Sequence, residues 1–312
     1  QNDKNNKINY DYSGIAASVD CNNRWVSLDP LRGSIAAVAE SARNVSCVGA
    51  LPVAITNNLN FASPETEIGY WQLSSACEGI SMACEVLETP VTGGNVSLYN
   101  ESIDDEGNKK PIQPTPVIGM VGVLDNVNKA ISSGWKNIND EIWIIGSRDS
   151  GLTLGATSYL EYFHGQVTGR PPSLNLIDEK LCQLFIRNGI LNNLIISSHD
   201  ISDGGLAIAL AEACILSEKG ASINLIADER KDRILFSEGG SRIVFSISHM
   251  KKNEWLKFVS EESKNFTDSI YITKIGTVSQ DILKIKILDN IICDLKISTL
   301  ADKFNNGLSN NF

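Results

Sequence analysis

Positively charged side chains are too few in this chain to hold the backbone of a nucleic acid. The 312 residues include 27 Lys and Arg against 37 Asp and Glu, which gives a formal net charge of −10 at pH 7. Proteins that bind nucleic acids use clustered basic side chains to displace the counterions around the phosphates. We therefore expect no nucleic-acid partner.

Histidine is also rare, and none stands where common catalytic or metal-binding motifs place it. His164, His199 and His249 have neither a nucleophile beside them nor the spacing of metal ligands. His199, at the end of an expected strand, is as well explained by a structural role as by a functional one. The Walker A motif, the dinucleotide-binding fingerprint and the protein-kinase motifs do not occur, so any ATP site must be of a less common kind.

Secretion and membrane insertion have no support in the sequence. The seven cysteines are scattered, odd in number and without a Cys-x-x-Cys pair, so we expect reduced thiols. There is no signal peptide and no apolar stretch that could cross a bilayer, which predicts a cytoplasmic protein without a membrane partner. The chain starts at Gln1 and has polar ends, so we expect it to be part of a longer polypeptide.

Apolar patterns predict an α+β fold of two domains, residues 1–130 and 131–312, divided near the polar passage 134–140. Strands and helices are mixed without the strict alternation of a doubly wound sheet. In the first half we expect a strand or hairpin at 13–29, a helix at 34–49, a strand at 51–61, a helix from Ser63 to Thr89 and a strand at 115–125. In the second half we expect helices at 176–190, 204–217 and 251–263, and strands at 141–146, 194–200, 222–226, 242–248, 271–278 and 283–288.

Three Gly-Gly pairs, each beside a polar side chain, stand at the edges of these elements. Glycine lets a phosphate approach main-chain N–H groups without meeting a Cβ atom. A single pair is more often a tight turn or a helix start, but three together favour a phosphate-binding role. The pairs are Gly93-Gly94 before Asn95, Gly204-Gly205 after Asp203, and Gly239-Gly240 after Glu238.

The segment HDISDGGLAIALAE (199–212) gives the most explicit prediction of the three. A helix start attracts anions, but Asp200 and Asp203 would repel a phosphate unless a divalent cation lay between them. This combination predicts a magnesium–nucleotide site. A plain N-cap by Asp203, with Asp200 in solvent, explains the segment equally well.

Six segments carry a family signature: DCNNRWVSLDP (20–30), ITNNLNFASPE (55–65), TPVTGGNVSLYNE (89–101), TPVIGMVG (115–122), HDISDGGLAIALAE (199–212) and LFSEGGSR (235–242). Together they resemble the phosphoribosylformylglycinamidine synthase family, and the match is to the carboxy-terminal half of its large, synthetase subunit. It runs in the correct order from about residue 12 to about residue 300. The first and third segments are specific to that family.

The resemblance implies a fold like that of the aminoimidazole ribonucleotide synthetase superfamily. In that fold an N-terminal α+β domain contributes strands to a shared β-barrel, a C-terminal α+β domain packs on it, and two such halves form a pseudo-dimer. The implied activity is ligation: ATP activates the formyl amide oxygen of formylglycinamide ribonucleotide, and ammonia from glutamine displaces phosphate to give the amidine. ATP and Mg²⁺ are the implied cofactors.

The resemblance also assigns roles to one segment. It implies that Gly94 and Asn57 contact ATP, that Asn95 ligates magnesium and that Ser97 contacts the ribonucleotide, all in a site shared across the pseudo-dimer. An amide oxygen suits this position because it completes the shell of a hard cation without adding charge. The family's catalytic histidines, its ATP-holding lysine and most of its acidic ligands lie in the other half. We therefore expect no catalytic residue here and no activity from this chain alone.

Three departures from the family pattern suggest that the nucleotide site belonging to this half is degenerate. They are Asn57 in place of Asp, Arg43-Asn44 where the first half carries Arg-Asp, and Ala156 in place of glycine. The acidic residues that would form a vestigial or auxiliary nucleotide site are Asp200, Asp203 and Glu238.

The expected partners are the missing amino-terminal half, a glutaminase subunit, a small accessory subunit and the small-molecule substrate. An isolated half would expose one side of the barrel sheet, which predicts a homodimer. Two alternatives remain open from the sequence. One is a noncatalytic module that binds ADP in its degenerate site, and the other is a stand-alone homodimeric relative that acts on another small phosphorylated substrate.

Overall fold

The computed structural model describes residues 12–150, 152–226, 229–239 and 241–307. Its first part is a four-stranded sheet in the order β1-β6-β2-β3, in which β2 pairs with β3 in parallel and the other pairs are antiparallel. The elements are β1 (Gly14–Asp20), α1 (Asn23–Leu28), α2 (Pro30–Cys47), β2 (Leu51–Asn60), α3 (Glu67–Leu87), β3 (Val91–Ser97), the hairpin β4 (Glu101–Ile103) and β5 (Lys109–Pro111), and β6 (Thr115–Leu124).

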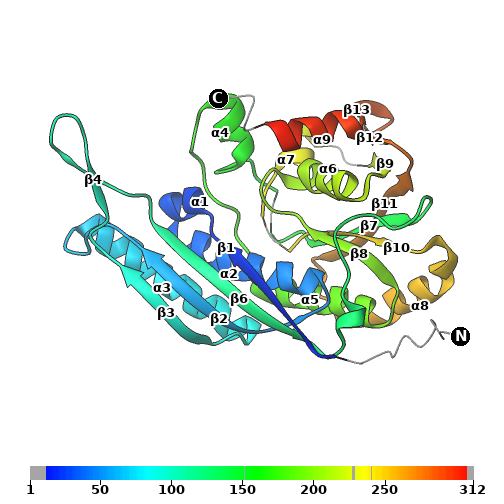
Figure 1. Cartoon of the computed structure of the whole chain (residues 1–312), viewed down its shortest axis with the longest axis horizontal. Helices are drawn as coiled ribbons and strands as arrows, with labels where there is room; N and C mark the ends of the chain where they lie inside the picture. The colour runs from blue at the N-terminus through cyan, green and yellow to red at the C-terminus, as the bar shows by residue number, and fades with distance from the viewer. Residues whose placement is uncertain (1–11, 151, 227–228, 240, 308–312) are drawn as a thin grey trace, which may run out of the picture.

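Two long helices cover one face of this sheet (Figure 1). Helix α2 begins where Asp29 accepts a hydrogen bond from the Arg32 backbone N–H and Pro30 takes the first helical position. Its small apolar residues, such as Val38 and Ala42, then pack closely on the strands. Helix α3 begins at Glu67 with Thr66 as its cap, so the helix start expected at Ser63 is wrong. The hydroxyl of Ser63 instead accepts a hydrogen bond from the Glu65 backbone N–H within the preceding turn.

The opposite face of the four-stranded sheet is open. Side chains alternate in exposure along β1, where those of Ile15 and Val19 are 78% and 72% exposed. Val121 and Val123 on the neighbouring strand β6 are also exposed on this face. Adjacent apolar side chains of this kind mark a surface that another protein surface covers.

The second part is a seven-stranded mixed sheet in the order β13-β12-β9-β11-β7-β10-β8. Helices α6, α7 and α9 cover one face, and α5 and α8 cover the other (Figure 1). The fold is therefore α+β, as expected. The elements are β7 (Glu141–Ser147), α4 (Ser158–His164), α5 (Leu176–Leu191), β8 (Ile195–Asp200), α6 (Gly205–Ser217), β9 (Gly220–Leu225), α7 (Lys231–Phe236), β10 (Ile243–Ile247), α8 (Lys252–Glu262), β11 (Ile270–Ser279), β12 (Ile282–Ile287), β13 (Asn290–Lys296) and α9 (Ile297–Asn306).

Most of the expected long elements are present, and the errors fall on short or exposed ones. Residues 23–28 form helix α1 and not part of a strand or hairpin, because Asn22 caps it. The edge strand β3 was not expected, since the side chains of residues 91–96 are all exposed and show no alternation.

The two sheets take their strands from either side of residues 125–140, and the division at residues 130 and 131 stays a prediction. No helix within the described ranges is long and apolar enough to cross a membrane.

A buried ion pair joins the two parts. Arg43 of α2 lies 2.9 Å from the carboxylate of Glu179 on α5, and their side chains are 3% and 0% exposed. Gln183 on the next turn of α5 donates a second hydrogen bond to the same carboxylate. Removing one partner of a buried ion pair lowers the free energy of unfolding by more than the intact pair contributes to it. The reason is that the remaining charge stays buried without a partner.

The open sheet face predicts self-association of the isolated chain. We expect light scattering to find a dimer, and we expect Val19→Lys to shift it to a monomer because an unpaired charge resists burial. Leu216→Lys, on the exposed side of α6, is the matched control and should leave the dimer intact. A monomeric unmodified chain would contradict this prediction.

The buried pair predicts a specific pattern of stability. Arg43→Met should lower the free energy of unfolding by about 3–5 kcal/mol, because the Glu179 carboxylate loses its counter-charge in the interior. Adding Glu179→Gln should recover most of that loss, since it removes the orphaned charge and keeps an acceptor for Gln183. Chemical denaturation of both variants measures the difference, and equal stabilities would argue against a structural ion pair.

Candidate functional site

The Gly-Gly-Asn segment forms the edge strand β3, and its register with β2 explains the need for glycine at position 94. Gly94 lies directly beside Asn57 in the parallel pair. A Cβ atom on Gly94 would come within 2.0 Å of Asn57 Oδ1, whereas one on Gly93 would meet nothing within 4 Å. The same Cβ atom would lie 2.9 Å from the backbone oxygen of Asn57, so a larger residue at position 94 would require both the Asn57 side chain and the paired strands to shift. β3 also ends the sheet, so its outer edge has no strand partner within the described residues.

The four residues assigned to the shared site lie on two sides of this edge. Asn57 and the position of Gly94 face the helix side, where Asn57 borders an open groove lined by α3. Asn95 pairs in register with Asn58 on the open side, where its amide nitrogen lies 3.5 Å from Asn58 Oδ1. In this orientation the amide oxygen of Asn95 is the atom left to bind a ligand from outside.

Ser97 lies further along the strand and is half-buried in the turn that follows. Its hydroxyl donates to the Asn100 side chain at 3.2 Å, and its carbonyl oxygen accepts from the same side chain at 2.8 Å. The structure thus places Asn57 and Gly94 on the helix side of this sheet edge and Asn95 on its open side, and it ties Ser97 to a local turn. Ser97 must release or share its hydroxyl to contact a substrate.

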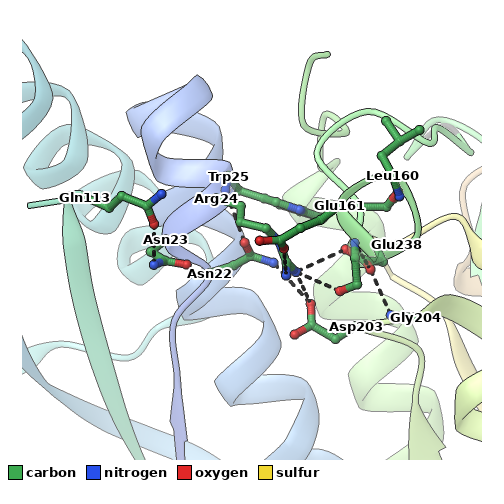
Figure 2. Close-up of polar contacts among 12 residues, drawn as sticks. Asn22, Asn23, Arg24, Trp25, Gln113, Leu160, Glu161, Asp203, Gly204 and Glu238 are labelled. Atoms are coloured by element: carbon green, nitrogen blue, oxygen red, sulfur yellow. Dashed lines mark hydrogen bonds and ion pairs between the residues drawn. The ribbon is translucent and has the colours of Figure 1, made fainter. Parts of the chain in front are cut away.

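A second group of charged residues surrounds Arg24, next to the N-terminus of α6 (Figure 2). The guanidinium lies 2.9 Å from Glu161 Oε2 and 3.0 Å from Asp203 Oδ1. The carboxylate of Glu238 lies 3.8 Å away and is almost fully buried. Arg24, which the sequence analysis did not select, therefore supplies the positive charge that a bound cation was expected to provide.

The expected capping of α6 by Asp203 is wrong. Gly204 is the N-cap residue, with φ of 75°, and no side chain of its own segment caps the helix. Its backbone N–H donates instead to Glu238 Oε1 at 2.8 Å, and the same oxygen accepts from the Ser158 N–H at 2.7 Å. Asp203, whose side chain is 68% exposed, points toward Arg24 and forms an ion pair with it at 3.0 Å.

These contacts leave little room for a nucleotide at the candidate auxiliary site. The cavity between Asp203, Glu238 and Glu40 measures about 10 Å³, which is space for about one water molecule. Buried oxygens without a hydrogen-bond partner do occur there, at Asp200 Oδ2 and Glu238 Oε2. A triphosphate would enter only if Arg24 moved away.

Asp200 lies in the interior at the end of β8, and not in solvent. Its backbone and side-chain oxygens both contact His199 Nδ1, and Glu212 Oε2 lies 3.2 Å from His199 Nε2. Burial lowers the pKa of His199, but the hydrogen bonds to Asp200 and Glu212 outweigh it and raise the pKa to about 10. His199 is therefore a protonated structural residue at neutral pH.

An acidic cluster beside Asp200 escaped the sequence analysis. Asp20 ends β1, and Glu40 and Asn44 occupy successive turns of α2, where Asn44 donates to Asp20 at 2.9 Å. Burial, with a smaller effect from the charge of Asp200, raises the pKa of both Asp20 and Glu40. Glu40 and Asn44 are four residues apart in an expected helix, and this spacing places their side chains on the same face. That spacing was the sequence feature from which the cluster could have been predicted. Within the described ranges, however, no three His, Cys, Asp or Glu side chains are arranged to hold a metal ion.

Comparison with known proteins places these features in a family. Models of the N-terminal and C-terminal domains of AIR synthase related proteins match residues 5–124 and 137–278. The phosphoribosylformylglycinamidine synthase subunit PurL of Prochlorococcus marinus strain MIT 9312 is 67% identical over 314 residues, covering 100% of this chain and 40% of that protein. The same subunit from strain MIT 9301 is 66% identical over 302 residues, covering 96% and 39%. The chain thus spans about two fifths of the length of these relatives.

Solved structures show the same fold at low identity. Thermotoga maritima PurL complexed with FGAR has a TM-score of 0.72 at 19% identity, covering 94% of this chain and 46% of that one. A chain of the HypE–HypF complex has a TM-score of 0.60 at 15% identity, covering 91% and 90%. Together with the sequence matches, these likenesses show that the chain belongs to the AIR synthase related family and corresponds to the carboxy-terminal part of the phosphoribosylformylglycinamidine synthase subunit PurL.

Proposed function

We propose that this chain forms one part of an ATP-dependent phosphoribosylformylglycinamidine synthase and contributes Asn57, Gly94, Asn95 and Ser97 to an active site shared with an amino-terminal part. The observation that carries the proposal is the open face of the four-stranded sheet. Exposed apolar side chains on β1 and β6 continue toward an exposed row of amides on β2 and β3. A second sheet that covers the apolar part would bring its own residues against Asn95.

The residues of β3 suit the roles that we assign to them. Asn95 offers a neutral oxygen from an exposed strand, so it can complete a magnesium shell whose charged ligands come from elsewhere. Gly94 presents its main chain without a Cβ, and Asn57 beside it offers an amide to the nucleotide. Asn95 would help to hold a bound Mg²⁺, which would supply positive charge to offset the negative charge of the phosphates. Ser97 would position the ribonucleotide substrate at the end of the same strand.

Acid–base chemistry must come from the other part of the enzyme. His199 is held between two carboxylates on the far side of α2 from the β3 edge, and His249 lies 3.4 Å from the buried Asp140. Neither is free to transfer protons beside Asn95. We therefore expect the chain to be inactive alone. We expect the complete enzyme to need a glutaminase partner, with a small accessory subunit, only when glutamine supplies the ammonia.

The proposal also favours a ligase over the noncatalytic ADP-binding module. The ion pairs of Arg24 with Asp203 and Glu161 occupy the place where that module would hold its nucleotide. The carboxylates of Asp203 and Glu161 are already paired with Arg24, and the cavity has space for about one water molecule. Neither feature suits a permanently bound Mg–ADP.

Reconstitution with ammonia tests the shared site without a glutaminase. We expect no turnover from this chain alone and ATP-dependent amidine formation after it is combined with the amino-terminal part of a relative. Asn95→Ala should lower kcat/KM by about tenfold to a hundredfold and raise the Mg²⁺ concentration needed, because one oxygen ligand is lost.

Asn290→Ala, at the exposed first residue of β13 and far from the β3 edge in the sequence, is the matched control and should behave as the unmodified chain. Turnover by the chain alone would contradict the proposal. An Asn95→Ala variant with unchanged Mg²⁺ dependence in an active assembly would remove Asn95 from the metal shell.

A further inference from the structure

A separate cavity of about 610 Å³ lies in the second part of the molecule, on the α6 side of the seven-stranded sheet. Strands β7, β9 and β11 form its floor, and α7 borders it. The volume is in the range of pockets that hold small organic molecules. Its apolar lining comes from Ile144, Leu206, Leu225, Ile234 and Ile275.

Gly146 on β7 allows two polar side chains to reach this cavity. It pairs with Tyr271 of β11 on one side, and the residue opposite it on the other side is Arg242, just before β10. A Cβ atom on Gly146 would come within 2.8 Å of Arg242 Cγ and 2.9 Å of the Tyr271 hydroxyl oxygen. Both side chains therefore lean over the glycine toward each other and into the cavity.

Arg242 is a buried cation without an anionic partner in the described part of the chain. Its side chain is 3% exposed, and its guanidinium donates to two carbonyl oxygens, those of Ser237 and Gly239. Burial lowers the pKa of Arg242, Tyr271 partly opposes this effect, and the positive charge of Arg43 adds to it. Buried charges in proteins are normally paired, so a guanidinium held this way has the electrostatic character of an anion site.

More positive charge surrounds the cavity mouth. Arg148 lies over the Tyr271 ring, 5.6 Å from its centroid, and donates one hydrogen bond to a carbonyl oxygen. Arg233 of α7 donates to the Leu152 carbonyl oxygen and lies 3.6 Å from Glu229. The ammonium of Lys274 is already paired with Glu141 at 2.7 Å. Among the described residues that line the cavity there are three guanidinium groups, one ammonium and one carboxylate, so this part of the surface differs from the net charge of −10 of the whole chain.

We propose that this cavity binds a small organic anion, with Arg242, Arg148 and Arg233 holding a phosphate or carboxylate group and the aliphatic walls and Tyr271 holding an apolar body. The planar guanidinium groups match the oxygens of either anion. This site is separate from the β3 edge and does not depend on the proposed synthase activity.

Calorimetric titration of the folded 312-residue chain with phenyl phosphate tests the proposal. We expect binding that weakens as KCl is added, with benzoate weaker because it carries less charge. Inorganic phosphate, which lacks the apolar body, and benzyl alcohol, which lacks the charge, should each bind at least about tenfold more weakly. If inorganic phosphate or benzyl alcohol bound as tightly as phenyl phosphate, the proposal would be overturned.

Variants then locate the site. Arg148→Gln and Arg233→Gln remove mouth charges at partly exposed positions, and each should weaken phenyl phosphate binding by about tenfold, as expected for a lost charge-assisted hydrogen bond. Lys257→Gln removes an exposed charge from α8 on the opposite face of the sheet and should change nothing. Asn95→Ala should also leave this binding unchanged. No binding to the folded chain, or binding unaffected by both arginine variants, would overturn the assignment.

Discussion

The four-stranded sheet buries one face under α2 and α3 and leaves Ile15, Val19 and Val123 on its other face in contact with solvent. Water is a poor environment for so many neighbouring apolar side chains, so this face favours contact with another protein surface. The exposed side chain of Asn95 belongs to the same surface. In the shared site that we propose, covering the face would therefore also bring residues of the other part against Asn95.

At the interface between the two parts, charges from the chain itself occupy the place where an auxiliary nucleotide site was expected. Arg24 of α1 pairs with Asp203 before α6 and lies near Glu238 before β10, and Arg43 of α2 pairs with Glu179 of α5. A guanidinium that belongs to the chain can neutralise these carboxylates without a cation from solvent. It therefore avoids the entropy loss of binding a free ion. Once Arg24 is present, Asp203 and Glu238 act as structural residues: one anchors Arg24, and the other caps α6 from a distance.

The sequence predicted the long buried elements correctly because their patterns repeat over several turns or strand positions. Helix α2 buries the apolar residues at helical spacing, such as Val38 and Ala42, and the apolar run at 115–125 forms strand β6. The candidate site was harder to predict. Asp203 followed the local rule for a helix cap, yet its partner Arg24 lies 179 residues away, and no local pattern contains such a contact. Glu238 likewise caps a helix from another element. The residues of β3 were selected through family resemblance, since the strand itself has no hydrophobic period.

The contact between Asn57 and Gly94 has a consequence for how this edge can evolve. Because the amide of Asn57 fills the space where a side chain at position 94 would begin, position 94 cannot become larger while Asn57 keeps its place. Position 57 can become smaller alone, but that step removes its polar group from the groove. Even then, a Cβ atom at position 94 would lie 2.9 Å from the backbone oxygen of residue 57, so the paired strands would also have to shift.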